Sequence, residues 1–272
     1  MPKVLTDDQI TFYRENGYLA PLDGVDPVDT AAMCDDLEAF ERDEGVLASS
    51  IVVKGHLCFR RSYEFSRHPG ILDVVEDLIG PNIMALSSRF WMKPGKDGSF
   101  VSWHQDSAYF GLDPHELVTV WLALTDSKPE NGCVRVIPGT HRGKSYSHVE
   151  TFDEKNLLAR GQSIDEIDDS GAVDLTLNAG QFSCHHERIV HGSAANDTDA
   201  MRIGIGIFYF PAHVKSTLGR RPADLVRGVD ERGHWDADPA PTEDRDARIL
   251  AHVREAGKRY TDPQYRQEAE TV

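Results

Sequence analysis

From residue 82 onward, the sequence is divided into short apolar runs that are separated by turn residues. The runs cover residues 83–92, 99–105, 118–125, 133–137, 173–178, 181–185 and 202–210. Gly, Pro and Asn-Gly signals stand between them, and the intervening segments lack helical periodicity, which is typical of strands. Such a succession of strands predicts a two-sheet jelly roll, whose interior can hold a small ligand.

Helical patterns flank these strands on both sides. Residues 6–9 form a capping box for a helix that should end near residues 16–17, Asp26-Pro27 should begin a second helix, and Pro69 and Gly80-Pro81 bracket a third. A last helix is expected at 245–260. We therefore predict a mainly β protein with flanking helices in a single domain over residues 1–272, made of a helical part at 1–81, a jelly-roll core at 82–215 and a C-terminal extension at 216–272.

Charge and composition narrow the class of partner. The net charge of −16 argues against nucleic acid and against an anionic membrane, because both require a basic surface. No apolar run reaches the ~20 residues that span a bilayer, and the N-terminus lacks the apolar core of a secretory signal, so we expect a cytoplasmic protein. The four cysteines show no C-x-x-C spacing and are expected to be reduced. The expected partner is a small molecule, and no feature predicts an oligomeric state.

The segment Trp103-His104-Gln105-Asp106 carries the most informative polar residues. If it is extended, His104 and Asp106 project from the same face of the strand. His191, in Val190-His191-Gly192-Ser193, is placed to complete a set of two histidines and one carboxylate. Such a set is typical of non-haem Fe(II) sites that keep positions open for oxygen chemistry.

Other histidines compete for the third position. His185 and His186 precede His191, but adjacent strand residues cannot both face one metal ion. We therefore favour a packing or surface role for this pair, although one of the two can lie near the pocket. His141 follows Pro138-Gly139-Thr140, where we expect it to stabilise a turn.

The order of motifs resembles that of a known family. His104 and Asp106 are followed by Tyr109-Phe110, Trp121, Asn131-Gly132-Cys133, the run from Pro138 to Gly143, His191-Gly192-Ser193 and Arg202. Over most of residues 5–215 this succession is similar to the phytanoyl-CoA dioxygenase family of Fe(II)/2-oxoglutarate oxygenases.

The resemblance implies a cupin-like double-stranded β-helix with iron at its mouth. It implies that His104, Asp106 and His191 bind Fe(II), that Arg202 binds the distal carboxylate of the cosubstrate 2-oxoglutarate, and that Trp121 and Ser193 lie near this cosubstrate. The implied activity is an O2-dependent dioxygenase reaction with hydroxylation as the default outcome. Desaturation, cyclisation and epimerisation remain open, whereas halogenation is set aside because Asp106 fills the position that a halide would need.

Arg202 also has a physical argument of its own. Its planar guanidinium suits a carboxylate, and it begins the apolar strand 202–210, where an unpaired charge would be costly. A solvent-exposed arginine at the strand end is the alternative. The rival class is a non-catalytic jelly-roll protein that binds a metal or a small molecule, and it predicts loss of this anchor.

The sequence constrains the substrate only loosely. A coenzyme A thioester would favour a basic entrance, whereas this chain is acidic, so we expect a small polar metabolite or a natural-product intermediate. Basic residues at 142–144 and 219–221 leave a coenzyme A thioester as the alternative substrate. Arg89 or Trp91 can reach the pocket, depending on the strand register. The long segment 140–170 is either a lid or a mobile loop.

Overall fold

The computed structural model describes residues 2–151, 153–158, 161–164 and 167–261. Its α-helices are α1 Asp7–Asn16, α2 Pro27–Glu44, α3 Arg60–Phe65, α4 Pro69–Ile79, α5 Ser107–Phe110 and α6 Ala247–Thr261. Its strands are β1 Tyr18–Asp23, β2 Ile83–Lys93, β3 Val101–His104, β4 Leu112–Asp113, β5 Val118–Ala123, β6 Val134–Ile137, β7 Val149–Glu150, β8 Gln162–Ser163, β9 Val173–Leu175, β10 Gln181–His186, β11 Val190–Ser193, β12 Arg202–Pro211, β13 Lys215–Ser216, β14 Pro222–Arg227 and β15 Asp236–Ala237.

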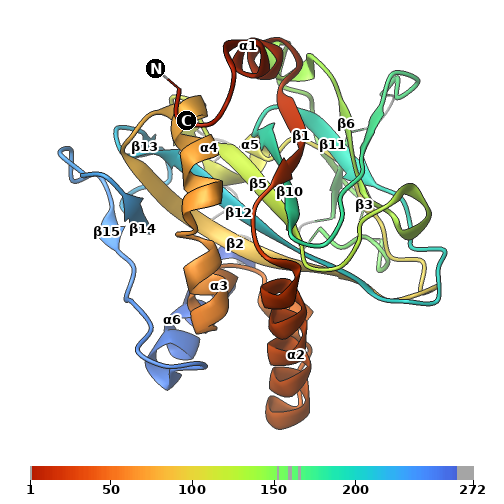
Figure 1. Cartoon of the computed structure of the whole chain (residues 1–272), viewed down its shortest axis with the longest axis vertical. Helices are drawn as coiled ribbons and strands as arrows, with labels where there is room; N and C mark the ends of the chain where they lie inside the picture. Colours follow the sequence, from red (N-terminus) through yellow and green to blue (C-terminus); the bar gives the residue numbers. More distant parts are fainter. Residues whose placement is uncertain (1, 152, 159–160, 165–166, 262–272) are drawn as a thin grey trace.

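Two sheets form the jelly roll (Figure 1). The larger sheet has the strand order β1-β10-β5-β12-β2-β14-β15, and the smaller has the order β3-β11-β6-β9. Neighbouring strands are antiparallel except for the short β14–β15 pair. The predicted class, a mainly β jelly roll with flanking helices, is confirmed.

Successive side chains of each strand point to opposite faces of the larger sheet. On β12, Ile203, Ile205 and Ile207 pack into the core that the helices cover, whereas Arg202 and Phe208 face the interior of the roll. Both faces are buried, so β12 is apolar along almost its whole length. Helices α2 and α4 pack against the outer face of the sheet, through Met33 and Leu37 of α2 and Ile71 of α4. Figure 1 shows α4, in orange, in front of the sheet.

Two glycines on β12 make room for aromatic side chains inside the roll. A Cβ added at Gly204 would lie 2.2 Å from the Trp121 ring, and one added at Gly206 would lie 3.0 Å from Trp91 Nε1. Any larger residue at Gly204 would therefore push the Trp121 ring out of its place. The glycines let two indoles lie against the sheet and form the floor of the pocket.

The predicted helices form where their caps indicated. The Thr6 side chain accepts a hydrogen bond from the backbone N–H of Gln9, and the Gln9 side chain accepts one from the backbone N–H of Thr6, so the capping box is present. Asp26 caps α2 and Pro27 occupies its first turn. Pro69 begins α4, and the last helix, expected at 245–260, begins two residues later and ends one residue later, at Ala247–Thr261.

Eight strands were absent from the prediction: the longer strands β1, β11 and β14, and the two-residue strands β4, β7, β8, β13 and β15. β1 lies inside the part expected to be helical, β14 lies beyond residue 215, and β11 carries His191. β1 contains Pro21 and pairs only with β10 at the sheet edge, where a missing N–H is tolerated. β11 has only four residues, one of them Gly192, so its local strand signal is weak. The larger sheet thus recruits strands from both sides of the segment 82–215.

The described parts of segment 140–170 pack against β3. Leu157 and Ile164 donate backbone hydrogen bonds to Phe100 and Trp103, and β7 pairs with β8. Part of the acidic run, residues 165–166, lies outside the described residues. In the stretches of chain that the structure describes, no helix is long and apolar enough to cross a membrane.

Candidate functional site

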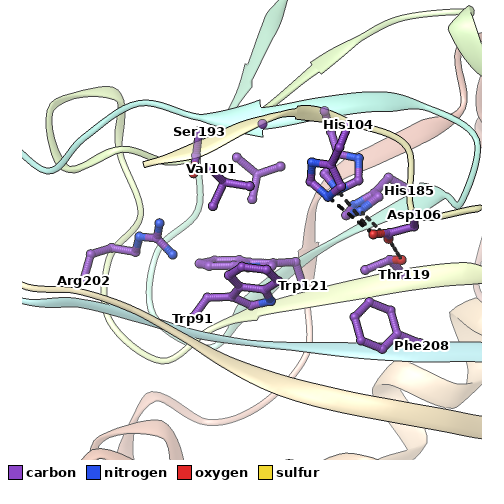
Figure 2. Close-up of a pocket in the computed structure, with 13 residues that line it drawn as sticks. Trp91, Val101, His104, Asp106, Thr119, Trp121, His185, Ser193, Arg202 and Phe208 are labelled. Carbon is purple, nitrogen blue, oxygen red and sulfur yellow. Dashed lines mark hydrogen bonds and ion pairs between the residues drawn. The ribbon is translucent and has the colours of Figure 1, made fainter. Parts of the chain in front are cut away.

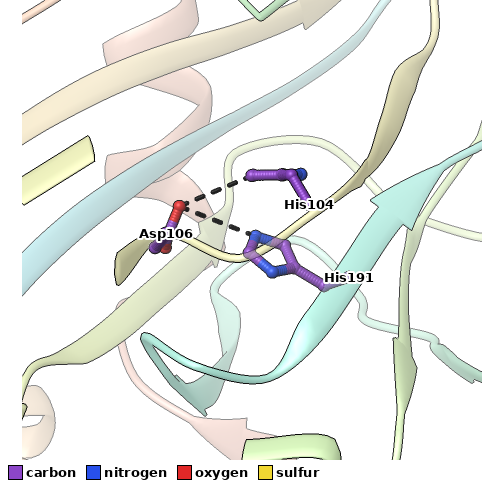
Figure 3. Close-up of side chains that lie close together, drawn as sticks. All are labelled: His104, Asp106 and His191. Carbon is purple, nitrogen blue, oxygen red and sulfur yellow. Dashed lines mark ion pairs between the residues drawn. The ribbon is translucent and has the colours of Figure 1, made fainter. Parts of the chain in front are cut away.

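Cross-strand pairing brings two of the predicted ligands together. His104 ends β3, and His191 lies directly opposite it on β11. Their ring centroids are 4.1 Å apart. The Nε2 atoms of His104 and His191 lie 3.5 Å and 3.9 Å from Asp106 Oδ1. All three side chains are buried and offer ligand atoms within 4.8 Å of one another, as Figure 3 shows. We call this group the metal end of the pocket.

Asp106 reaches this point by a route that differs from the expected one. The strand stops at His104, and Asp106 adopts helical dihedrals, φ −61° and ψ −32°, as the residue before α5. The prediction that His104 and Asp106 share one face of a continuous strand is therefore wrong. The turn into α5 swings the carboxylate towards the imidazoles instead. The Gln105 side chain points elsewhere, as expected, and donates to the carbonyl of Arg188.

The protein itself orients the three side chains. His104 Nδ1 lies 2.9 Å from the carbonyl oxygen of Ser102, and His191 Nδ1 lies 3.1 Å from that of Ile189. Because a carbonyl only accepts, each Nδ1 carries the proton and each Nε2 keeps its lone pair for a metal ion. Thr119 Oγ1 donates to Asp106 Oδ2 over 2.8 Å, which leaves Oδ1 facing the imidazoles.

The charge states also suit a metal ion. Burial would by itself raise the pKa of Asp106, but His191 and His104 outweigh it, so the pKa is lowered and the carboxyl is ionised. Burial and the nearby His104 lower the pKa of His191 well below its usual value, so this imidazole is neutral. A neutral imidazole and an ionised carboxylate are the forms that bind metals.

His185 lines the same pocket from β10. It is 1% exposed, and its Nε2 lies 3.9 Å from Asp106 Oδ2. Neither ring nitrogen has a hydrogen-bond partner among the described residues. Burial lowers the pKa of His185 to about 4, so it is neutral. The sequence favoured a packing or surface role for His185 and His186 but left open that one of the two lies near the pocket, and His185 is that residue. His186 does pack, against His141 with ring centroids 5.3 Å apart.

The opposite end of the pocket is positively charged. Figure 2 shows Arg202 at the far side from His104 and Asp106, with Trp91 and Trp121 between them. Ser193 lines the pocket near this end. The register of β2 settles the question about its side chains. Arg89 and Trp91 are two positions apart on β2, so both side chains face the interior of the roll. Trp91 lines the pocket, and the Arg89 guanidinium lies 4.4 Å from the centroid of the Trp91 ring.

Arg202 is buried, and this excludes the solvent-exposed alternative. It is 2% exposed, one terminal nitrogen donates to the carbonyl of Gly132 over 2.9 Å, and Nε has no partner among the described residues. The guanidinium lies 5.1 Å from the Trp121 ring centroid. Burial lowers the pKa of Arg202 to about 10, so the side chain is still charged at neutral pH.

The segment after Tyr146 contributes one more residue next to the metal end. The backbone N–H of Gln105 donates to His148 Nε2 over 3.0 Å, and Gln105 Oε1 accepts from the N–H of Tyr146. Burial and the nearby His104 lower the pKa of His148 to about 4. His148 was not among the predicted site residues, because no local pattern indicates that this distant segment folds back onto β3.

Comparisons with known proteins agree with this geometry. The phytanoyl-CoA dioxygenase (PhyH) family model matches residues 13–204. The peroxisomal phytanoyl-CoA dioxygenase of Rattus norvegicus is 30% identical over 255 residues, which are 84% of this chain and 75% of the relative. A probable alpha-ketoglutarate-dependent hypophosphite dioxygenase of Stutzerimonas stutzeri is 30% identical over 184 residues, which are 66% of this chain and 64% of that protein.

A solved structure extends the similarity to almost the whole chain. The apo form of the non-heme monooxygenase ThoJ superposes with a TM-score of 0.84 and 28% sequence identity, and the match covers 97% of this chain and 100% of that one. The similarity thus includes the N-terminal helices and the C-terminal extension as well as the strands of the jelly roll.

Proposed function

This chain belongs to the phytanoyl-CoA dioxygenase family of Fe(II)- and 2-oxoglutarate-dependent oxygenases, and we propose that it hydroxylates a small polar metabolite or a natural-product intermediate with release of succinate and carbon dioxide. The observation that carries the proposal is one pocket with two different ends. Two imidazoles and a carboxylate meet at one end, and a buried guanidinium lies at the other.

The residues present fit the metal ion that the family uses. In the proposal His104, Asp106 and His191 hold Fe(II), since their donor atoms converge and their Nδ1 and Oδ2 atoms are already engaged by the protein. Three protein ligands leave positions open on the ion. When bound there, Fe(II) together with 2-oxoglutarate supplies the activation of dioxygen.

The rest of the pocket would orient the cosubstrate and the substrate. Arg202 offers a charge-assisted bond to the distal carboxylate of 2-oxoglutarate, and Ser193 and Trp121 line the path between that point and the metal end. His185 supports a polar substrate, because neither of its buried ring nitrogens has a partner among the described residues and a polar molecule in the pocket would supply one. The net charge of −16 favours such a substrate over a polyanionic thioester.

Two observations would test the proposal. Anaerobic protein with Fe(II) and 2-oxoglutarate should develop a weak visible charge-transfer band, which a non-catalytic jelly-roll protein would not show. Candidate polar metabolites are then screened for substrate-triggered formation of succinate under air. Product analysis distinguishes hydroxylation from desaturation, cyclisation or epimerisation. Absence of the band in iron-loaded protein would contradict the proposed cosubstrate.

A further inference from the structure

A second buried cation lies beside Arg202. Lys93 is the last residue of β2 and is paired in register with Arg202 on β12. It has no exposed surface. Both cations approach the same turn, because Arg202 donates to the carbonyl of Gly132 and a Cβ added at Gly132 would lie 3.0 Å from Lys93 Nζ. We call Arg202, Lys93 and Ser193 the cation end of the pocket.

Lys93 acts on the pocket through Ser193. Its ammonium donates to Ser193 Oγ over 2.7 Å and also to the carbonyl of Ala194. Ser193 lines the pocket, whereas Lys93 lies behind it. An ammonium only donates, so the Ser193 oxygen accepts this bond and its own hydroxyl proton remains available for an acceptor in the pocket.

No protein anion balances the two charges. Among the residues that the structure describes, neither cation forms an ion pair with a carboxylate, and Asp97 acts on Lys93 only at longer range. Burial and the neighbouring Arg202 lower the pKa of Lys93 to about 7. Two desolvated cations side by side are costly unless an anion joins them. The cost is explained if the cation end is built for a bound carboxylate.

We propose that Lys93 is a positioning residue for the distal carboxylate of 2-oxoglutarate: it holds Ser193 so that the hydroxyl donates to that carboxylate beside Arg202, and it adds a second positive charge to the cation end. The inference rests on the proposed function. It explains a preference for a 2-oxo acid with two carboxylates, because a 2-oxo acid without the distal carboxylate would leave both cations unpaired.

The test measures binding rather than turnover. Wild type and Lys93→Met, a neutral side chain of similar length, are loaded with Fe(II) without oxygen and titrated with 2-oxoglutarate and with 2-oxobutyrate, which lacks the distal carboxylate. Lys93→Met should weaken 2-oxoglutarate binding by about 10-fold or more, the size of one lost charge-assisted hydrogen bond. Binding of 2-oxobutyrate should change by less than about twofold, because only the distal carboxylate interaction is removed.

Matched variants separate the proposed role from simpler ones. Lys96→Met removes a lysine three positions away that is exposed and paired with Asp199, so it should leave both titrations unchanged. Ser193→Ala should weaken 2-oxoglutarate binding, and the double variant should lose less than the product of the two single effects. Lys93→Gln, which keeps a donor without the charge, should fall between wild type and Lys93→Met.

Thermal unfolding provides the structural control. If Lys93 is retained for the cosubstrate, Lys93→Met without ligand should melt at the same temperature as wild type or higher, because a buried unpaired charge is removed. Equal loss of affinity for both 2-oxo acids together with a lower melting temperature would mean that Lys93 only supports the fold. An unchanged 2-oxoglutarate affinity would overturn the inference while the proposed function stands. Absence of a charge-transfer band in wild type would overturn both.

Discussion

The metal end and the cation end of the pocket are prepared for their ligands in different ways. At the metal end, the backbone carbonyls of Ser102 and Ile189 and the hydroxyl of Thr119 already hold the two imidazoles and the carboxylate. At the cation end, Arg202 and Lys93 have no carboxylate partner among the described residues. One end is therefore oriented in advance, and the other is completed by the anion it binds.

This difference has an energetic reason. At the metal end the Asp106 carboxylate lies against two imidazoles, and hydrogen bonds from the protein fix the geometry of all three side chains. Two buried cations repel each other and gain most when an anion enters. Binding at the cation end should therefore depend on charge and pH, whereas binding at the metal end should depend on the geometry of the ligands.

The first prediction concerns the metal end. His191→Ala removes one metal-binding imidazole and should abolish turnover. Loss of a residue that only hydrogen-bonds to a metal ligand lowers metal affinity by roughly 10- to 100-fold, so loss of the ligand itself should lower Fe(II) affinity by more than that. The fold should be retained, since His191 lies on the pocket wall. Metal titration and circular dichroism measure the two effects. His213→Ala, at an exposed histidine paired with Glu116, is the control. Wild-type iron binding would remove His191 from the ligand set.

The second prediction concerns the cation end. Arg202→Ala should leave iron bound but remove a charge-assisted pair worth roughly 2 to 5 kcal/mol in a desolvated site. The affinity for 2-oxoglutarate should fall by about 30-fold or more, since ~1.4 kcal/mol is a factor of ten. The anaerobic charge-transfer titration measures the midpoint. An unchanged midpoint would mean that Arg89 or another basic residue anchors the cosubstrate, or that 2-oxoglutarate is not the cosubstrate.

The third prediction tests whether the hydrogen bond from Thr119 orients the Asp106 carboxylate at the metal end. Thr119→Val has nearly the same shape but cannot donate to Asp106 Oδ2. Fe(II) affinity should fall by about 10-fold, because the carboxylate loses the bond that orients it. Once iron is saturating, the 2-oxoglutarate midpoint should stay at the wild-type value. A shift of the 2-oxoglutarate midpoint alone would show that the two ends are not independent.

The fourth prediction uses pH. The anion needs Lys93 protonated, and burial beside Arg202 lowers the pKa of Lys93 to about 7 in the free protein. As pH rises above 7, the protonated fraction falls, so the affinity for 2-oxoglutarate should fall by about tenfold in all by pH 9, towards the affinity of Lys93→Met. Arg202 keeps its charge over this range, because its pKa is about 10. The other groups that act on Lys93 are Cys133, whose pKa burial raises to about 11, and the half-buried Asp97.

Lys93→Met is the control for this pH series. Its 2-oxoglutarate midpoint should be weaker than that of wild type at pH 6 and should change little up to pH 9. Titrations with 2-oxobutyrate at the same pH values measure any contribution from the metal end. A wild-type affinity that is independent of pH would show that Lys93 is not the titrating group that the carboxylate requires.

The sequence predicted the local features well because they depend on near neighbours. The capping box at Thr6, the Asp26 cap and the Pro69 start each concern one helical turn. It missed β11 for the same reason, since Gly192 weakens the local signal and pairing with β3 and β6 creates the strand. His104 and Asp106 converge as expected, but through a turn into α5 rather than along a strand.

The direction of His185 shows a second limit. Phe182 and Cys184 alternate with His185 on β10, so the sequence already indicates that His185 points away from them. It does not indicate which face is the pocket, because helices bury one face and the smaller sheet buries the other. Only the folded sheet assigns Phe182 and Cys184 to the helical core and His185 to the pocket wall.

Residue type and spacing were enough to predict the chemistry of this protein: short apolar runs, a His-x-Asp pair, a distant histidine and an arginine that starts an apolar strand. The tertiary structure decided which side chains meet. Lys93, Ser193 and Arg202 come from three strands, and only their pairing and packing place two cations and one hydroxyl around the same point. The reason is physical, because contacts between distant segments depend on register and burial, which no local pattern encodes.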